Sequence, residues 1–398
     1  MTDDRQRSGW SDDLADHVGR LDRQIQRERE AALREVEPLL ERTSEARWPA
    51  LAEHPLLQTC GALSQLATIV NRELTARPRY AEAVAQLAVS VSEGLPEAKY
   101  SPMVVAQIRA MSWKGLGKVL GFLGRYDESL EALSHAEALI TGYPALVYDL
   151  AIARFNRALT LQEMDRHEES FALFSECKQT FREYGDTRLI VICGFAEGVL
   201  LQRLQEYRAA REAHLLILAS TLDIDPGTRA ALHQAIGLCS MELGDFIDAE
   251  ANLVRSIALN RELGQPVEAL KGEMSRGRLL LRKGEPEAAL EHLRPVRREL
   301  LRHTLNEEAG ICGLEMVSAY LLLDRPDDAA QLAGTIVKQF TAANLNGRAA
   351  IALGYLSEAI AARRATTALV KEIREYIISL RTSPERDFKP RHATDGAR

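Results

Sequence analysis

Apolar residues recur at three- and four-residue spacing along most of the chain, which is typical of amphipathic helices. In the segment 103–123, Trp113, Leu116 and Leu120 follow this spacing. Stretches that contain Pro and Gly, such as TGYPAL, DIDPGT and LGQPVE, interrupt the pattern and predict helix ends. Because no segment alternates apolar and polar residues with a period of two, the sequence predicts helices and essentially no sheet.

The helical pattern repeats about every forty residues. Successive short corners lie 39 to 41 residues apart, and they are Gly124-Arg125-Tyr126, Asp165-Arg166-His167, Gln205-Glu206-Tyr207, Gly244-Asp245-Phe246, Gly284-Glu285-Pro286 and Asp324-Arg325-Pro326. A period of this length indicates a repeat architecture in which each unit is one pair of helices. We therefore expect each corner to join two antiparallel helices.

Small residues recur at two fixed positions around these corners. Three residues after the last corner residue stand Ser129, Ser170, Ala210, Ala249, Ala289 and Ala329. Nine residues before it stand Gly117, Ala158, Gly198, Gly237, Gly277 and Val317. Glycine lowers helix stability by roughly 1 kcal/mol relative to alanine. Its recurrence therefore predicts that the two helices of each pair approach closely at this level.

One repeat carries a recognisable signature. The residues Trp113-x-x-Leu116-Gly117-x-x-Leu120, followed by Gly124-x-Tyr126-x-x-Ser129, resemble the tetratricopeptide repeat (TPR). The forty-residue period resembles the long-helix variety of this repeat in bacterial regulatory proteins. The resemblance implies an all-α fold, a right-handed α-solenoid of helix-turn-helix repeats. It also implies a concave face lined by the first helix of each pair.

The pattern predicts five parts along the chain. They are an N-terminal charged helical segment (1–54), a degenerate first helical repeat (55–102), a core array of six TPR-like repeats (103–345), a C-terminal capping helix pair (346–382) and a disordered tail (383–398). The first part carries a narrow apolar stripe through Leu14, Val18, Leu21 and Ile25. This stripe packs on the first repeat, or it forms a coiled-coil contact through which the N-terminal helix mediates assembly.

Composition excludes several classes of protein. The net charge of −7 argues against direct nucleic-acid binding, which favours a basic stripe. The first ten residues lack an apolar core and no apolar run approaches ~20 residues, so neither a signal peptide nor a membrane span is predicted. Five scattered cysteines without a CxxC pair indicate reduced core thiols. We expect a cytoplasmic protein without disulfides or a zinc site.

Catalytic and cofactor motifs are not found. The sequence has no phosphate loop, dinucleotide fingerprint, nucleophile elbow or HExxH helix, and we therefore predict a non-enzymatic protein without cofactor. Asp223 and Asp225 precede a glycine as in the start of a calcium loop, but the later ligands are missing. A turn between helices is favoured there.

The resemblance assigns function to the concave face, as a protein-protein interaction scaffold, adaptor or regulator. The candidate partner-binding residues are Lys114, Lys118, Phe122, Phe155, Gln162, Phe195, Gln202, Arg203, Gln234, Met274, Arg278 and Arg282. Aromatic anchors beside Gln, Lys and Arg favour a protein or peptide partner that carries acidic groups. In the alternative interpretation, Phe155 and Phe195 fill gaps between helices, and Arg278 and Arg282 lie on a solvated face.

Other functions stay open at this point. Chaperone-binding members of the TPR family hold a C-terminal carboxylate with lysines and asparagines. Lys114 and Lys118 fall at lysine-like positions, but matching asparagines are absent, so such a clamp is not predicted. The alternatives are a peptide-responsive regulatory sensor, including one that acts in transcription, and an accessory subunit of a larger enzyme assembly.

Overall fold

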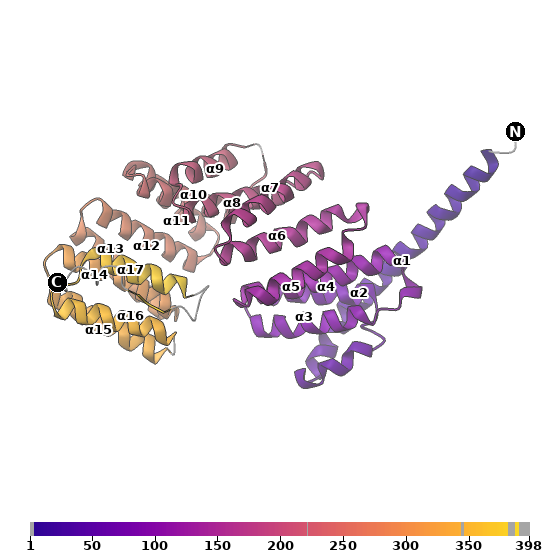
Figure 1. The fold of residues 1–398 in the computed structure, drawn as a ribbon, viewed down its shortest axis with the longest axis horizontal. Helices are drawn as coiled ribbons and strands as arrows, with labels where there is room; N and C mark the ends of the chain where they lie inside the picture. The colour runs from indigo at the N-terminus through magenta and orange to yellow at the C-terminus, as the bar shows by residue number, and fades with distance from the viewer. Residues whose placement is uncertain (1–3, 221, 344–345, 381–386, 390–398) are drawn as a thin grey trace. The chain divides into compact units, whose positions relative to one another are not determined.

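The protein is all-α in the computed structural model, which describes residues 4–220, 222–343, 346–380 and 387–389 (Figure 1). Side chains are described from residue 23 onward, except that of residue 97. These residues form α-helices and short 3-10 helices, and no strand occurs among them. The prediction of a helical repeat fold is confirmed. The chain divides into an N-terminal unit, which ends at Asp186, and a C-terminal unit, which begins at Thr187.

The N-terminal unit consists of a long helix followed by three helix pairs. Its elements are α1 (Asp4–Arg42), the 3-10 helix η1 (Glu45–Glu53), α2 (Cys60–Glu73), α3 (Pro78–Glu93), η2 (Glu97–Lys99), α4 (Pro102–Phe122), α5 (Tyr126–Ile140), η3 (Pro144–Leu146), α6 (Val147–Glu163) and α7 (His167–Glu183). The C-terminal half of α1 packs on α2, and its buried residues Ala32, Val36 and Leu40 join a core that extends to α4. The apolar stripe at Leu14, Val18 and Leu21 lies outside the described side chains.

The C-terminal unit consists of five helix pairs. Its elements are α8 (Thr187–Arg203), α9 (Tyr207–Ala219), α10 (Pro226–Glu242), α11 (Phe246–Glu262), α12 (Pro266–Arg282), α13 (Pro286–Arg302), α14 (Asn306–Leu322), α15 (Pro326–Ala342), α16 (Gly347–Ala361) and α17 (Thr367–Ser379). The last helix departs from the stacking of the others, because α17 packs against α14 as well as α16 (Figure 1).

The six predicted corners join the two helices of a pair, as expected. The first residue of each corner adopts a positive φ, and these residues are Gly124, Asp165, Gln205, Gly244, Gly284 and Asp324. In this conformation the corner amide reaches back to the preceding helix, as where Arg125 N donates to Leu120 O at 2.9 Å. Glycine adopts it without strain, which explains Gly124 with φ of 77°.

The small residues lie where the helices of a pair cross. All six residues of the first set are fully buried, from Ser129 in α5 to Ala329 in α15. A Cβ atom on Gly277 would lie 2.2 Å from Leu293 Cδ2, and one on Gly117 would lie 2.6 Å from Leu133 Cγ. In these two pairs the leucine of the second helix therefore occupies the space that a Cβ atom would need.

Two further predictions concern polar and sulfur groups. Asp225 caps α10, because its carboxylate accepts from Thr228 N at 2.9 Å, so the DIDPGT segment is a helix start.

All five cysteines have free, buried thiols. No described helix has the length and apolar character needed to cross a bilayer.

Most of the expected disordered tail lies outside the described residues. Its described part, Asp387 to Lys389, is placed against α16 and α17. The Phe388 ring lies 5.0 Å from the Tyr376 ring and 5.8 Å from the Tyr355 ring, measured between centroids. Asp387 pairs with Arg348 at 3.1 Å.

Candidate partner-binding surfaces

The first helices of the N-terminal unit carry a basic surface, here called the lysine surface, that consists of Asn71, Lys114, Lys118 and Phe122. Asn71 belongs to α2 and the other three residues belong to α4. Lys118 Nζ donates a hydrogen bond of 2.7 Å to Asn71 Oδ1. Phe122, in the last position of α4, keeps 51% of its surface exposed. An apolar ring and two ammonium groups therefore lie on one helix within about two turns.

Neither ammonium group forms an ion pair with a carboxylate of the described residues. Desolvation lowers the pKa of Lys114, a nearby charge on Asp149 opposes this change, and the charge of Lys118 adds to it. Desolvation also lowers the pKa of Lys118. The side chains described in the structure provide Lys114 with no hydrogen bond or ion pair, and Asp149 Oδ2 accepts from Gln107 Nε2 at 3.0 Å. The lysine surface is therefore short of negative charge.

Asn71 is a contact that the sequence did not predict. The sequence has no asparagine at the positions that would match the lysines of a clamp. Asn71 comes from α2, in the degenerate first repeat at 55–102, where no corner signature fixes the alignment. The four-residue spacing of Lys114 and Lys118 predicts that they share one face of a helix. The position of Asn71 beside them depends on the packing of α2 against α4, which the sequence does not show.

The predicted aromatic anchors lie between helices. Phe155 is 9% exposed, and its ring lies 5.7 Å from that of Phe174 in α7. Phe195 contacts the ring of His214 in α9, with centroids 5.3 Å apart. Gln162 and Met274 are also buried. These residues fill the space within the helix stack, in agreement with the alternative interpretation of the phenylalanines.

The predicted glutamines connect neighbouring first helices. Gln202 Nε2 on α8 donates to Ala235 O on α10 at 2.9 Å. Gln234 Nε2 on α10 donates to Ser275 Oγ on α12 at 3.3 Å. Since these amides already have partners inside the unit, they hold the helices in register. Arg203, at the end of α8, is exposed.

Two of the predicted arginines of the C-terminal unit, Arg278 and Arg282, are neutralised by glutamates. Arg278 Nε lies 2.9 Å from Glu315 Oε1, and the same carboxylate pairs with Arg374 of α17. Burial acts to raise the pKa of Glu315, but the charges of Arg278 and Arg374 outweigh it and the pKa is lowered. Arg282 pairs with Glu242 of α10. The arginines expected to attract an acidic partner are therefore bound within the unit.

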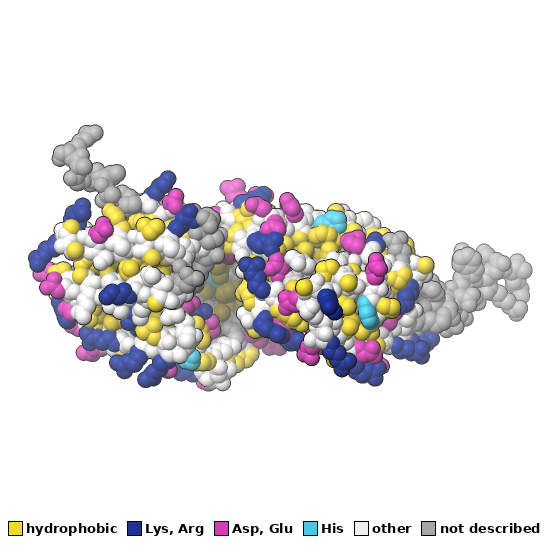
Figure 2. Space-filling model, turned by 90° about the horizontal axis from the view of Figure 1, so that it is seen from below, with side chains coloured by type: hydrophobic (Ala, Val, Ile, Leu, Met, Phe, Trp, Pro, Cys, Tyr) yellow, Lys and Arg dark blue, Asp and Glu magenta, His cyan; other side chains and the backbone are white. Residues whose placement is uncertain are grey.

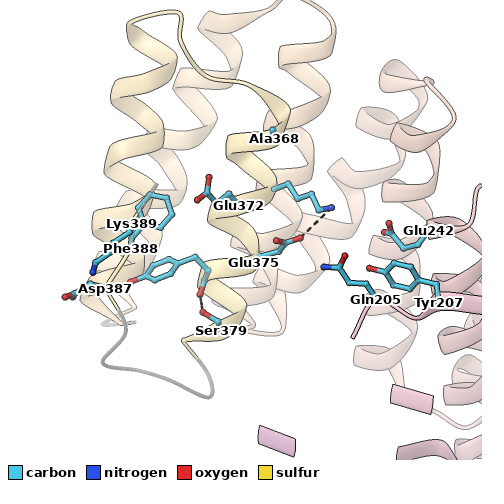
Figure 3. Close-up of a pocket in the computed structure, with 12 residues that line it drawn as sticks. Gln205, Tyr207, Glu242, Ala368, Glu372, Glu375, Ser379, Asp387, Phe388 and Lys389 are labelled. Atoms are coloured by element: carbon cyan, nitrogen blue, oxygen red, sulfur yellow. Dashed lines mark hydrogen bonds and ion pairs between the residues drawn. The ribbon is translucent and has the colours of Figure 1, made fainter. Parts of the chain in front are cut away.

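A cavity of about 810 Å³ lies beside α17 in the C-terminal unit (Figure 3). One wall is formed by α17 and residues Asp387, Phe388 and Lys389, and the other by the α8–α9 corner and the end of α10. The lining residues are Gln205, Tyr207, Glu242, Ala368, Lys371, Glu372, Glu375, Tyr376, Ser379, Asp387, Phe388 and Lys389. Burial raises the pKa of Tyr207, and the charges of Glu242 and Glu375 raise it further. The cavity thus combines aromatic rings with groups of both charges.

Charge is mixed over the surface. Figure 2 shows acidic and basic side chains interspersed over the visible face, without a large area of one sign. The lysine surface is therefore defined by the contacts of its own residues and not by a large area of positive charge.

Comparison with known proteins identifies the fold. No family model matches the sequence, and no curated protein matches it. Among solved structures, the chain is similar to a signal-transduction ATPase with a tetratricopeptide repeat sensor from Pyrococcus horikoshii, with a TM-score of 0.57 and 12% identity over 90% of this chain and 53% of that one. The chain has the tetratricopeptide-repeat fold.

Two bacterial proteins share this TPR fold with the chain. Aspartyl phosphate phosphatase F from Bacillus subtilis has a TM-score of 0.53 and 11% identity over 70% of each chain. The quorum sensor NprR from B. thuringiensis has a TM-score of 0.50 and 14% identity over 82% of this chain and 99% of that one. At these identities the similarity establishes the fold and leaves the function to the surfaces described above.

Proposed function

We propose that this protein is a non-catalytic adaptor or regulator that docks an acidic segment of a partner protein on the lysine surface. The observation that carries the proposal is the unpaired, partly desolvated ammonium group of Lys114 beside Lys118. A carboxylate placed between the two lysines would supply the missing negative charge and accept charge-assisted hydrogen bonds. Exposed Phe122 would provide an apolar contact next to it.

Preorganisation supports the same proposal. Lys118 is already oriented by Asn71, and both residues stand on packed helices. Binding an extended segment on such a surface avoids the cost of ordering the scaffold. The segment would contribute the negative charges, and the helices would contribute a fixed spacing of positive ones.

The proposal is tested with a hexaglutamate peptide titrated into the full chain at low salt, with affinity measured by calorimetry. We expect the double variant K114E/K118E to weaken binding at least tenfold. The control R255E/K338E changes the net charge by the same amount, but it leaves the lysine surface intact, and its affinity should stay within about twofold of the wild type. Equal weakening by both variants would show that only net charge matters and would overturn the proposal.

A second candidate function is peptide sensing in the cavity of the C-terminal unit. It is favoured by the position of α17, which forms one cavity wall and is also bound to α14 through Arg374 and Glu315. A peptide that bridges Tyr207 and α17 would be coupled to the helix stack through this ion pair. A pool of synthetic random hexapeptides should then protect α17 from hydrogen exchange in the wild type. It should not do so in Ala368→Trp, which fills the cavity.

We further propose a cytoplasmic protein that binds neither nucleic acid nor membranes directly. Free, buried cysteines in both units fit a reducing compartment. An accessory role in a larger assembly would use α1, whose N-terminal part extends away from the other helices of its unit (Figure 1). Deletion of residues 1–22 should then lower the number of chains per particle, measured by light scattering. An unchanged number of chains would exclude assembly of the protein through this segment.

A further inference from the structure

Helix α9 carries a histidine where the other repeats carry apolar residues. Seven residues after the last corner residue, the second helices hold Leu133, Phe174, His214, Leu253, Leu293 and Ala333. All six side chains are buried at this position, where the two helices of a pair cross. The position is part of the core in each of these six pairs, and among them only the α8–α9 pair holds a titratable group there.

The imidazole of His214 is enclosed without a hydrogen-bond partner. The residue is 0% exposed. A Cβ atom on Gly198 would lie only 2.3 Å from its Cε1, and the Phe195 ring lies 5.3 Å away. Neither Nδ1 nor Nε2 has a hydrogen-bond partner among the described residues. Buried polar nitrogens without partners are rare, and each one disfavours the folded state.

The ionisable groups around His214 do not stabilise a positive charge on its ring. Helix α9 is packed between α8 and α10. The ionisable groups of these three helices are Arg188, Cys193, Glu197 and Arg203 on α8, Tyr207, Arg208, Arg211 and Glu212 on α9, and Arg229, His233, Cys239 and Glu242 on α10. None of them shifts the titration of His214, for which burial is the only cause. A protonated ring would therefore have no carboxylate to balance it.

We infer that His214 makes the crossing of α8 and α9, here called the histidine joint (Phe195, Gly198 and His214), a pH-sensitive element of the fold. Protonation places a positive charge between a phenylalanine and a glycine backbone, where the described residues offer the ring no hydrogen-bond acceptor. The ring becomes hydrated only when the two helices separate. Acid therefore favours an opened α8–α9 pair, while pairs with leucine at this position are unaffected.

The direction and range of the effect follow from linkage. Burial lowers the pKa of His214 from 6.5 to about 4 in the closed pair. An opened pair, in which the ring is hydrated, takes up a proton near pH 6.5, so the opened state binds more protons between these values. The closed pair is fully stable above pH 6.5 and loses stability as the pH falls toward 4. The opening equilibrium rises by about tenfold per pH unit in this range.

Opening of this pair would also change the cavity of the C-terminal unit, because Tyr207, the first residue of α9, lines the cavity wall. This consequence rests on the proposed sensing function, whereas the histidine joint itself does not. Hydrogen exchange reads the joint directly, whether or not the cavity binds a peptide.

The test is hydrogen exchange of the full chain between pH 7.5 and 5, corrected for the intrinsic pH dependence of exchange. Three proteins are compared: the wild type, His214→Leu, and the control His303→Gln, which removes an exposed histidine. The α12–α13 pair, with Leu293 at the same position, serves as the internal reference. We expect protection of α8 and α9 to fall about tenfold per pH unit below 6.5 in the wild type and the control. In His214→Leu it should follow the reference pair.

A second measurement makes the test independent of the variant's folding. The Cε1 proton of His214 is titrated by NMR in the wild-type protein. A pKa well below 6.5 supports the inference, and a pKa of 6.5 or higher with the helices still protected would overturn it. Identical pH dependence of α8–α9 protection in the wild type and a folded His214→Leu would also overturn it.

Discussion

The two units treat the cations of their first helices differently. In the N-terminal unit, Lys114 has no ion pair with a described residue and is partly desolvated. In the C-terminal unit, Arg278 and Arg282 are bound by Glu315 and Glu242. Basic residues on the first helices therefore form ion pairs within the C-terminal unit, whereas Lys114 of the N-terminal unit stays available to a ligand. The difference lies in whether the carboxylate of a neighbouring helix pairs directly with the cation, as Glu315 and Glu242 do, or accepts from another residue, as Asp149 does from Gln107.

The largest effect is expected from removing the central carboxylate of the C-terminal unit. Glu315→Gln leaves Arg278 and Arg374 without their shared charge, in a site where the glutamate side chain is 6% exposed. Breaking such a buried pair from one side costs about 3–5 kcal/mol. We expect this loss in the free energy of unfolding measured by denaturant titration, together with faster hydrogen exchange of α17.

A surface pair provides the control for this change. Glu268→Gln removes a pair with Lys271 in which both side chains are about half exposed. This substitution should change the free energy of unfolding by no more than about 1 kcal/mol. If Glu315→Gln were no more harmful than Glu268→Gln, the arginines would be poorly bound, and the contrast between the units would disappear.

Glycines at the helix crossings give the next largest effect. Gly277→Ala places a Cβ atom 2.2 Å from Leu293 Cδ2, so the buried Leu293 side chain or the helix that carries it must shift. Overpacking of this kind costs about 1–3 kcal/mol. Gly334 lies in a helix of the same unit and has open space around it. Gly334→Ala should therefore raise the free energy of unfolding by about 0.5–1 kcal/mol. Thermal unfolding of both variants would show whether the small residues serve close packing, since shifts of the same sign would contradict it.

Removing the unpaired cation of the N-terminal unit should stabilise the protein. In Lys114→Met, a partly desolvated charge without a partner is replaced by an apolar side chain of similar length. We expect a gain on the order of 1 kcal/mol at pH 7. Because desolvation lowers the pKa of Lys114 in the folded state, the gain should shrink as the pH rises toward 10.5, where the wild-type lysine loses its charge.

The smallest effect is expected at the cysteines, where the two units should behave alike. Burial raises the pKa of Cys60 to about 11 and that of Cys312 to about 12. At pH 8 both therefore remain protonated and weakly nucleophilic. Iodoacetamide should leave the native thiols unmodified, as measured by mass spectrometry, and should modify them after unfolding. Rapid native labelling in one unit would show that its core opens.

Much of the fold followed from the sequence because it depends on local rules. The corner residues Gly124 and Asp324 stand where the backbone must adopt a positive φ, and this requirement restricts the residue type. The small residues, such as Gly277, stand where two backbones meet. Both constraints leave a mark in each repeat, so a single sequence shows them.

The candidate site was less predictable because it depends on long-range pairs. Arg278 looked like a free cation in its own repeat, but Glu315 of the next repeat and Arg374 of the last helix decide its state. Asn71 joins Lys118 from a repeat without a clear signature. The placement of α17 beside α14 also has no signal in the sequence, since α17 has the same apolar spacing as any second helix.

The most direct test of the account is the pKa of Lys114, measured by NMR of its side chain without and with the hexaglutamate peptide. We predict a pKa below the usual lysine value of 10.5 in the free protein, because desolvation of the ammonium group outweighs the nearby charge of Asp149. On saturation with the peptide the pKa should rise. A free-state pKa at or above 10.5, or one that the bound peptide leaves unchanged, would contradict the proposal that this surface docks an acidic segment.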